Sequence, residues 1–192
     1  VEYPLMLRRK VIIKLEKIAQ DLPDGVYLKL NSAFKSKKQQ DIAWQEAMNE
    51  MMKLHPGVGR NEIIQLAHFK AKDPKLGLGG HETGGAVDVC LCDKDGIDFD
   101  YGTKFHEHND YTATKNVHLT TEQKRNRNHL VKIMKKEGFV NFPGEWWHFS
   151  YGDRMWAAYK GKRNGAKYGS VEKGFDGNYV FAIPTKKINL EN

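Results

Sequence analysis

The stretch from Gly79 to Asp88 reads Gly-Gly-His-Glu-Thr-Gly-Gly-Ala-Val-Asp, and it decides the fold that we expect for the chain. It separates His81 from Asp88 by seven positions and places two glycines between them. Apolar residues surround the aspartate, which predicts a glycine-rich loop that turns into a strand. Gly85 occupies the place of the second histidine of an H-E-x-x-H zinc helix, so this stretch is not that motif. We expect Asp88 to project from the strand and Glu82 to be exposed.

A second segment, Glu145-Trp146-Trp147-His148-Phe149, supplies another histidine with a carboxylate three positions before it. Each segment by itself is more typical of a turn or a half-buried strand than of an active site, so the prediction depends on their combination. Two imidazoles and one carboxylate suit a catalytic zinc and leave a fourth position for water. We therefore expect His81, Asp88 and His148 to hold one Zn²⁺. Glu145 is left over, and metal-assisted hydrolysis needs such a carboxylate as a general base.

Together the two segments resemble a family pattern, Ser-x-His-x-x-Gly-x-Ala-x-Asp followed later by Glu-x-Trp-His. This pattern is that of the zinc D-alanyl-D-alanine peptidases, most closely the VanX-type dipeptidases, with VanY-type D,D-carboxypeptidases as relatives. The matching residues are His81, Gly84, Ala86, Asp88, Glu145, Trp147 and His148. The resemblance extends from about Leu7 to about Tyr168. It implies a zinc enzyme that hydrolyses the free dipeptide D-Ala-D-Ala.

Three positions depart from that pattern. Lys35 stands where the family carries an arginine that is implied to stabilise the developing oxyanion, and a lysine offers a point charge in place of a planar fork. We expect Lys35 to take this role, with a solvated turn lysine as the equal alternative. Gly79 replaces a serine. His106 replaces an acid that is implied to hold the substrate's ammonium, so Glu107 is the candidate substrate-binding residue. His106 and His108 could form a second metal site, although surface positions are the simpler interpretation.

The length of 192 residues, without a break in composition, predicts one zinc peptidase domain over residues 1–192. The charge of +7 could suit nucleic acid or an anionic cell wall, but the lysines are scattered and no basic block is interleaved with aromatics. We therefore expect no nucleic-acid partner. No apolar run approaches the ~18 residues of a membrane span, and no signal peptide is visible.

The two cysteines, Cys90 and Cys92, lie two positions apart in the predicted strand and therefore point to the same face. A bridge between such neighbours is awkward geometrically, so we expect reduced thiols packed in or beside the core. Reduced thiols favour a reducing compartment, and hence the cytoplasm. The chain begins at Val1 without methionine, so the alternative is the periplasm or cell envelope after removal of a leader.

Hydrophobic periodicity and turn signals predict the secondary structure. We expect helices over residues 5–22, 37–54, 61–69 and 120–138, the last with a Thr120–Gln123 capping box, and strands over residues 26–30, around Asp88, over 146–151 and over 179–183. This order favours an α+β fold with a small, mostly antiparallel sheet, helices packed against it, and the zinc site at its open edge.

Two alternatives to a dipeptidase stay open. The first keeps the chemistry and changes the substrate, because a D,D-carboxypeptidase or murein endopeptidase would act on peptidoglycan stem peptides. The basic charge and the departures at Lys35, Gly79 and His106 favour it somewhat. The second is a non-catalytic module in which a retained zinc site only recognises peptidoglycan.

Overall fold

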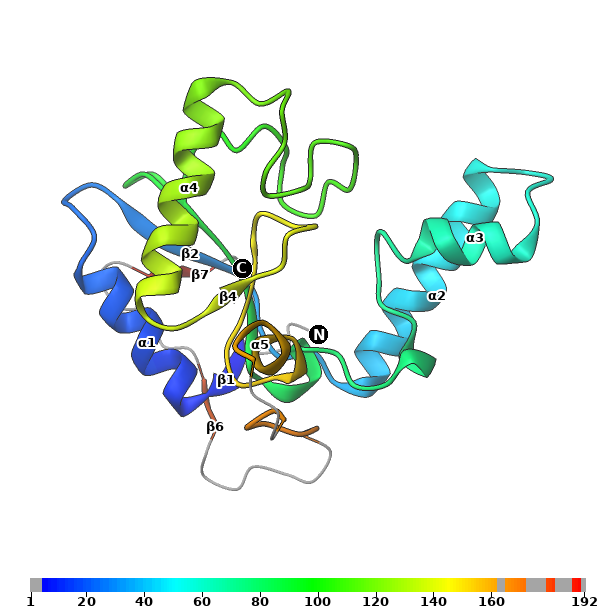
Figure 1. Cartoon of the computed structure of the whole chain (residues 1–192), viewed down its shortest axis with the longest axis horizontal. Helices are drawn as coiled ribbons and strands as arrows, with labels where there is room; N and C mark the ends of the chain where they lie inside the picture. The colour runs from blue at the N-terminus through cyan, green and yellow to red at the C-terminus, as the bar shows by residue number, and fades with distance from the viewer. Residues whose placement is uncertain (1–4, 162–164, 172–178, 182–187, 191–192) are drawn as a thin grey trace.

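The chain forms an α+β structure around a five-stranded sheet (Figure 1). The computed structural model describes residues 5–161, 165–171, 179–181 and 188–190. Its strands are β1 (Met6–Arg8), β2 (Tyr27–Ser32), β3 (Ala86–Cys92), β4 (Val140–Asn141), β5 (His148–Ser150), β6 (Tyr179–Phe181) and β7 (Ile188–Leu190). Its helices are α1 (Arg9–Gln20), α2 (Lys37–Leu54), α3 (Arg60–Ala67), α4 (Thr121–Lys136) and α5 (Arg154–Tyr159), with short 3₁₀ turns η1 (Pro74–Leu76) and η2 (His81–Thr83).

The strands of the main sheet lie in the order β4-β5-β3-β2-β7. The first four pair antiparallel, and β7 pairs parallel with β2. Strands β1 and β6 form a separate antiparallel pair. The predicted α+β class with a small, mostly antiparallel sheet is therefore confirmed.

Alternation along β3 gives the sheet two different faces. Val87 and Val89 belong to the main apolar cluster, so Asp88 between them points to the opposite face. The register carries this alternation to β5, where Phe149 lies opposite Val87 and His148 lies opposite Asp88. A slip of one residue would exchange the two faces, so burial of the apolar set holds the register. Strand pairing thereby brings Asp88 and His148 side by side on the face opposite the main apolar cluster, which we call the polar face.

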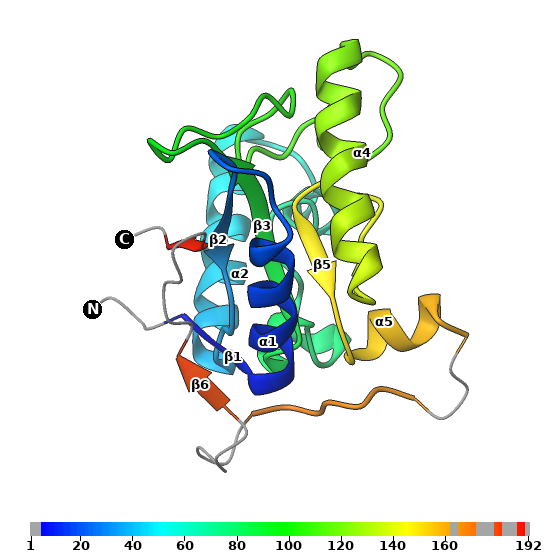
Figure 2. The same cartoon turned by 90° about the vertical axis from the view of Figure 1, so that its left-hand side faces the viewer.

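Helices α1 and α4 cover the apolar face of the sheet (Figure 2). They contribute Val11, Leu15, Ile18, Leu130 and Met134 to the main cluster. The capping box predicted at the start of α4 is present. Helix α1 begins at Arg9, later than the periodicity predicts, because the preceding residues form β1 and pair with β6, which is remote in the sequence.

Helices α2 and α3 pack against each other on the other side of the sheet (Figure 1). Helix α2 spans the predicted residues and starts with a capping box between Ser36 and Gln39. A second apolar cluster joins the two helices and consists of Trp44, Ala47, Met48, Met51, Ile63 and Ala67. Gln40 and Ala43 of α2 line the same cavity as Asp88, so this helix pair forms a wall beside the polar face.

The remaining expectations are met in part. Asp88 and His148 lie on β3 and β5, which are inner strands, so the polar face lies more centrally than the open edge that we expected. The predicted strand over residues 146–151 contains only β5, and positions 182 and 183 of the last predicted strand lie outside the described residues. Both cysteines are buried and free, as predicted. Within the described residues, none of the helices has the length and apolar character that a membrane crossing requires.

Candidate active site

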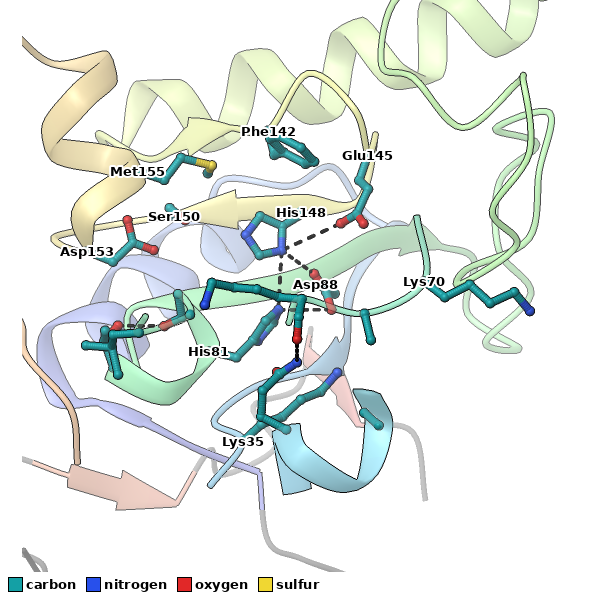
Figure 3. Close-up of a pocket in the computed structure, with 18 of the residues that line it drawn as sticks. Lys35, Lys70, His81, Asp88, Phe142, Glu145, His148, Ser150, Asp153 and Met155 are labelled. Atoms are coloured by element: carbon teal, nitrogen blue, oxygen red, sulfur yellow. Dashed lines mark hydrogen bonds and ion pairs between the residues drawn. The ribbon is translucent and has the colours of Figure 1, made fainter. Parts of the chain in front are cut away.

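Three side chains that are remote in the sequence converge on the polar face of the sheet (Figure 3). One ligand atom each from His81, Asp88 and His148 lies within 4.8 Å of the other two. Nδ1 of His148 lies 2.9 Å from Oδ1 of Asp88, and Nε2 of His81 lies 3.3 Å from Oδ2 of the same carboxylate. The two imidazole nitrogens are 3.3 Å apart. The predicted convergence is therefore present, and the group could hold one metal ion.

The loop before β3 sets the orientation of the His81 ring. Residues 81–83 form η2, which ends at Gly84 with φ of 66°, a left-handed conformation that favours glycine. Nδ1 of His81 lies 2.6 Å from the carbonyl oxygen of Ala33. A proton on Nδ1 would be donated to that carbonyl, which leaves Nε2 as a lone-pair donor facing Asp88.

The turn between β4 and β5 places Glu145 and His148 together. The side-chain amide nitrogen of Asn141 donates to the backbone carbonyl oxygens of Glu145 and His148, each at 3.0 Å. The Asn141 side-chain oxygen accepts a hydrogen bond from Thr114 at 2.7 Å, which fixes the amide in turn. Both carboxylate oxygens of Glu145 then face imidazoles, one 3.9 Å from Nδ1 of His148 and one 3.8 Å from Nδ1 of His108.

Charge and burial act against each other in this cluster. Burial by itself would raise the pKa of Asp88, but the charge of His81 and hydrogen bonds from the surrounding imidazoles hold that pKa well below its usual range. Burial lowers the pKa of His81. Burial also acts to lower the pKa of His148, yet the hydrogen bond and charge of Asp88 outweigh it and raise that pKa. The cluster therefore combines an ionised carboxylate with one imidazole whose pKa is lowered, His81, and one whose pKa is raised, His148.

Burial raises the pKa of Glu145, and the charge of Asp88 adds to this effect. The charges that His148 and Lys35 carry when protonated lower the pKa of Glu145 instead. A carboxylate with a raised pKa is a stronger base than an ordinary glutamate, which suits proton transfer near neutral pH.

The cluster lines a cavity of about 410 Å³, a volume typical of ligand pockets. Lys35 and His81 border it on one side, and Phe142 and Glu145 border it on another (Figure 3). The backbone N–H of Lys35 donates to the carbonyl of His81 at 3.3 Å, so this lysine is held beside the cluster. The charge of Lys35 acts on Glu145 and His81. Stabilisation of the oxyanion by Lys35 stays a prediction, and the position of the residue in the cavity wall is compatible with it.

Glu107 lies apart from this cavity. It is exposed and lines a second, smaller cavity with Asp98 and Trp146. Its carboxylate accepts hydrogen bonds from the backbone of Lys104 at 2.9 Å and from the side chain of Asn109 at 3.1 Å. The structure therefore does not bring Glu107 to the cluster, and its substrate-binding role stays a prediction without geometric support.

His106 and His108 both border the cavity, and His106 is at the same time exposed, as the simpler interpretation predicted. Nε2 of His106 lies 3.9 Å from Oδ2 of Asp88, and His108 packs edge-on against Trp147. Burial lowers the pKa of His108 to about 4, so its ring is neutral at neutral pH. The H-x-H spacing of these residues pointed to a functional role in the sequence. Nothing in the local sequence, however, showed that the loop that carries them lies next to Asp88 of β3.

The expectation that Glu82 is exposed is wrong. It is 7% exposed, and its Oε2 accepts a hydrogen bond from the backbone N–H of Gly79 at 2.7 Å. A Cβ on Gly79 would lie 2.9 Å from that oxygen. A serine at position 79 would therefore require the end of the Glu82 side chain to shift, a contact that the glycine avoids.

Comparison with known proteins identifies related peptidases. The model of a family described as D-Ala-D-Ala dipeptidase, peptidase family M15, matches residues 5–163. A D-alanyl-D-alanine dipeptidase of Synechocystis sp. is 36% identical over 48% of this chain and 44% of its own length. A D-alanyl-D-alanine dipeptidase of Escherichia coli (strain K12) is 27% identical over 65% of this chain and 55% of its own length. The chain spans about half the length of these curated relatives.

Solved structures share the fold at low sequence identity. A mutant VanY D,D-pentapeptidase from a VanB-type vancomycin-resistance cassette, in complex with Zn(II), superposes with a TM-score of 0.51 at 18% identity, over 76% of this chain and 72% of that one. VanYB in complex with D-alanine-D-alanine superposes with a TM-score of 0.52 at 17% identity, over 84% and 80%. Because the family model covers most of the sequence, the chain belongs to the D-Ala-D-Ala dipeptidase family of peptidases.

Proposed function

We propose that this chain is a single zinc peptidase domain that hydrolyses D-Ala-D-Ala. The observation that carries the proposal is the convergence of His81, Asp88 and His148 within 4.8 Å, with Glu145 3.9 Å from one of the ligand nitrogens. The named relatives from Synechocystis and E. coli are D-alanyl-D-alanine dipeptidases, and they support the choice of substrate.

Zinc fits the residues that are present. Two imidazole nitrogens and one carboxylate oxygen are a donor set of catalytic zinc sites. The contact between His81 and the Ala33 carbonyl is the outer-shell arrangement that orients a metal-bound histidine. Asp88 is 2% exposed and makes its ion pairs with imidazoles among the described residues, so a divalent cation would balance its buried charge. When bound, zinc supplies Lewis-acid polarisation of a carbonyl and a lower pKa for water.

The side chains of this chain would move the protons. Glu145 would accept a proton from the attacking water at a carboxylate oxygen and then donate it to the nitrogen of the leaving amine. The raised pKa of Glu145 favours the first of these transfers, in which the carboxylate takes up the proton. The ammonium group of Lys35, which lines the same cavity, would stabilise negative charge on the oxygen of the scissile carbonyl.

The second candidate is a D,D-carboxypeptidase or murein endopeptidase. His106 borders the cavity where the family resemblance implies an acidic residue, and that departure favours a substrate other than the free dipeptide. The cavity volume does not separate the two, because about 410 Å³ would admit part of a longer peptide as well.

Metal analysis combined with a D-alanine release assay tests the proposal. We expect about one zinc per chain and release of D-alanine from D-Ala-D-Ala. Glu145→Gln should keep the zinc and lower kcat by about 10²–10⁴-fold, the usual contribution of a general base. A strong preference for a pentapeptide stem would select the second candidate. Zinc binding without any turnover would instead indicate a peptidoglycan-recognition module.

A further inference from the structure

Asp153 uses only one of its carboxylate oxygens for structure. It is the N-cap of α5, and Oδ1 accepts a hydrogen bond from the backbone N–H of Trp156 at 2.7 Å. The residue is 1% exposed, and Oδ2 has no hydrogen-bond partner in the described part of the chain. A buried oxygen without a donor costs free energy, so this second oxygen needs an explanation.

Ser150 presents a second polar atom of this kind. It lies on β5 two positions after His148, so both side chains project from the same face of the strand. Ser150 is fully buried, and among the described residues nothing pairs with its hydroxyl. Asp153 follows three positions later, where the chain leaves β5 and enters α5.

Both residues line the cavity that contains the His81–Asp88–His148 cluster. In Figure 3 Ser150 and Asp153 lie on one side of His148, and Glu145 lies on the other. Gly80 leaves room for the carboxylate, because a Cβ at that position would lie 2.6 Å from Oδ2 of Asp153. The charge of Asp153 also acts on His148. Two oxygens without a donor among the described residues therefore lie next to the cluster, in a cavity that Lys35, Lys72 and Arg154 also line.

We infer that Asp153 and Ser150 form a subsite for a primary ammonium group of the peptide substrate. An ammonium carries three donors and a positive charge, which matches one ionised carboxylate oxygen and one hydroxyl oxygen. The inference rests on the proposed function for the identity of the ligand as a peptide. The ammonium is the amino terminus of a dipeptide or the side chain of a diamino acid in a longer peptide, and both present the same chemistry.

The helix cap alone does not explain an aspartate here. Asparagine and aspartate are equally good N-caps, and a cap needs only one oxygen. Asp153→Asn therefore keeps the hydrogen bond to Trp156 and removes the negative charge. This variant separates the structural role of the residue from the binding role.

The test measures peptide binding by calorimetry to zinc-loaded protein in the Glu145→Gln background, with and without Asp153→Asn. The first peptide pair is D-Ala-D-Ala and N-acetyl-D-Ala-D-Ala, which differ by the terminal ammonium. The second pair is Nα-acetyl-L-Lys-D-Ala-D-Ala and its Nα,Nε-diacetyl form, which differ by the side-chain ammonium. Asp93→Asn is the matched control, because Oδ1 of Asp93 also accepts backbone hydrogen bonds but lies outside the cavity.

We expect one pair to show tighter binding of the ammonium form, and Asp153→Asn to weaken that form alone by about 10- to 100-fold, the range of a charge-assisted hydrogen bond. The pair that responds identifies the source of the ammonium. Ser150→Ala should weaken the same form to a smaller extent. Equal binding within both pairs, or discrimination that survives Asp153→Asn, would overturn the subsite. Turnover of the same peptides by the wild-type protein tests the proposed function separately, since the binding comparison needs no catalysis.

Discussion

At the scale of single residues, Glu145 and Lys35 illustrate how position determines chemistry. Neither side chain shows its chemistry in its local sequence, since a glutamate in a half-buried strand and a lysine in a turn can both be purely structural. Their chemistry comes from the cavity, where burial raises the pKa of Glu145 and where the charge of Lys35 is close enough to act on it. Electrostatic effects of this kind are stronger in a buried site than in water.

Substitution of Lys35 tests its role at the oxyanion. Lys35→Met should keep the bound zinc and lower kcat by about 10²–10³-fold, the cost of removing one oxyanion donor. Lys35→Arg should retain more activity, because it keeps the positive charge. Steady-state kinetics of D-alanine release measure both, with Lys94→Met, which removes an exposed lysine paired with Asp95, as the control. Full activity in Lys35→Met would assign this residue to the solvated turn.

At the scale of elements, the turn between β4 and β5 holds the proposed base. The side-chain amide of Asn141 donates to the carbonyl of Glu145 in that turn and to the carbonyl of His148 at the start of β5, and its own oxygen accepts from Thr114. This arrangement stiffens a segment that no regular structure supports. The conformation of the turn between β4 and β5 therefore sets the distance from the Glu145 carboxylate to the proposed metal ligands.

Asn141→Ala should displace Glu145 without removing any ligand. We expect unchanged zinc stoichiometry, a loss of about 1–3 kcal/mol in the free energy of unfolding, and a decrease of kcat of up to about 10²-fold, because small misplacements of catalytic groups are costly. Asn126→Ala, which removes a surface amide bonded to the Asp100 carbonyl, is the control. A normal kcat with lowered stability would show that the turn tolerates the change.

Two buried groups, Cys90 on β3 and Tyr101 beside it, should make the stability of the protein depend on alkaline pH. Burial raises the pKa of Cys90, and the nearby charge of Asp98 adds to the effect. Burial likewise raises the pKa of Tyr101, whose hydroxyl accepts from the backbone of Leu91. In the unfolded chain these groups ionise at about pH 8.5 and 10, whereas in the folded state they stay protonated. The folded state then binds more protons, so stability is complete below about pH 8.5 and falls as the pH rises.

Denaturant unfolding at pH 7 to 10.5 measures this effect. Each group should cost up to about 1.4 kcal/mol per pH unit once its unfolded-state pKa is passed. Cys90→Ala should remove the thiol's share between pH 8.5 and 10, and the native thiol should react slowly with thiol reagents at pH 8. Equal pH dependence in wild type and Cys90→Ala would contradict the assignment.

At the scale of the whole molecule, the site joins parts of the fold that are remote in the sequence and that the sheet brings together. His81 comes from η2, Asp88 from β3 and His148 from β5, while α2 and the loop with His106 and His108 complete the cavity. Metal binding should therefore stabilise the folded chain as a whole, since the ligands meet only when the sheet is formed.

Zinc should raise the free energy of unfolding by about 2.7 kcal/mol when free zinc is 100 times its Kd. The pKa of His148 is raised, so zinc must displace a proton from it, and affinity should increase as the pH rises through that pKa. Thermal melts with zinc and with chelator at pH 5.5 and 8 test both statements. His148→Ala should abolish the zinc effect, and the exposed His129→Asn should keep it. A zinc effect that persists in His148→Ala would place the metal elsewhere.

The sequence by itself determined the helices with strong periodicity, the Thr120–Gln123 capping box, the buried free cysteines and the identity of the clustered residues. These depend on local pattern, since a 3.6-residue period, a cap or a motif is contained in a short window. The group of His81, Asp88 and His148 could be named because the two segments match one motif pair.

Only the tertiary structure decided the rest. It converted Met6–Arg8 into a strand through pairing with β6, buried Glu82 against Gly79, and placed His106 and His108, but not Glu107, at the cavity. It also left Oδ2 of Asp153 and the hydroxyl of Ser150 without hydrogen-bond partners among the described residues. The physical reason is that each of these outcomes depends on contacts between segments remote in the chain, and no local window contains the free energy of such contacts.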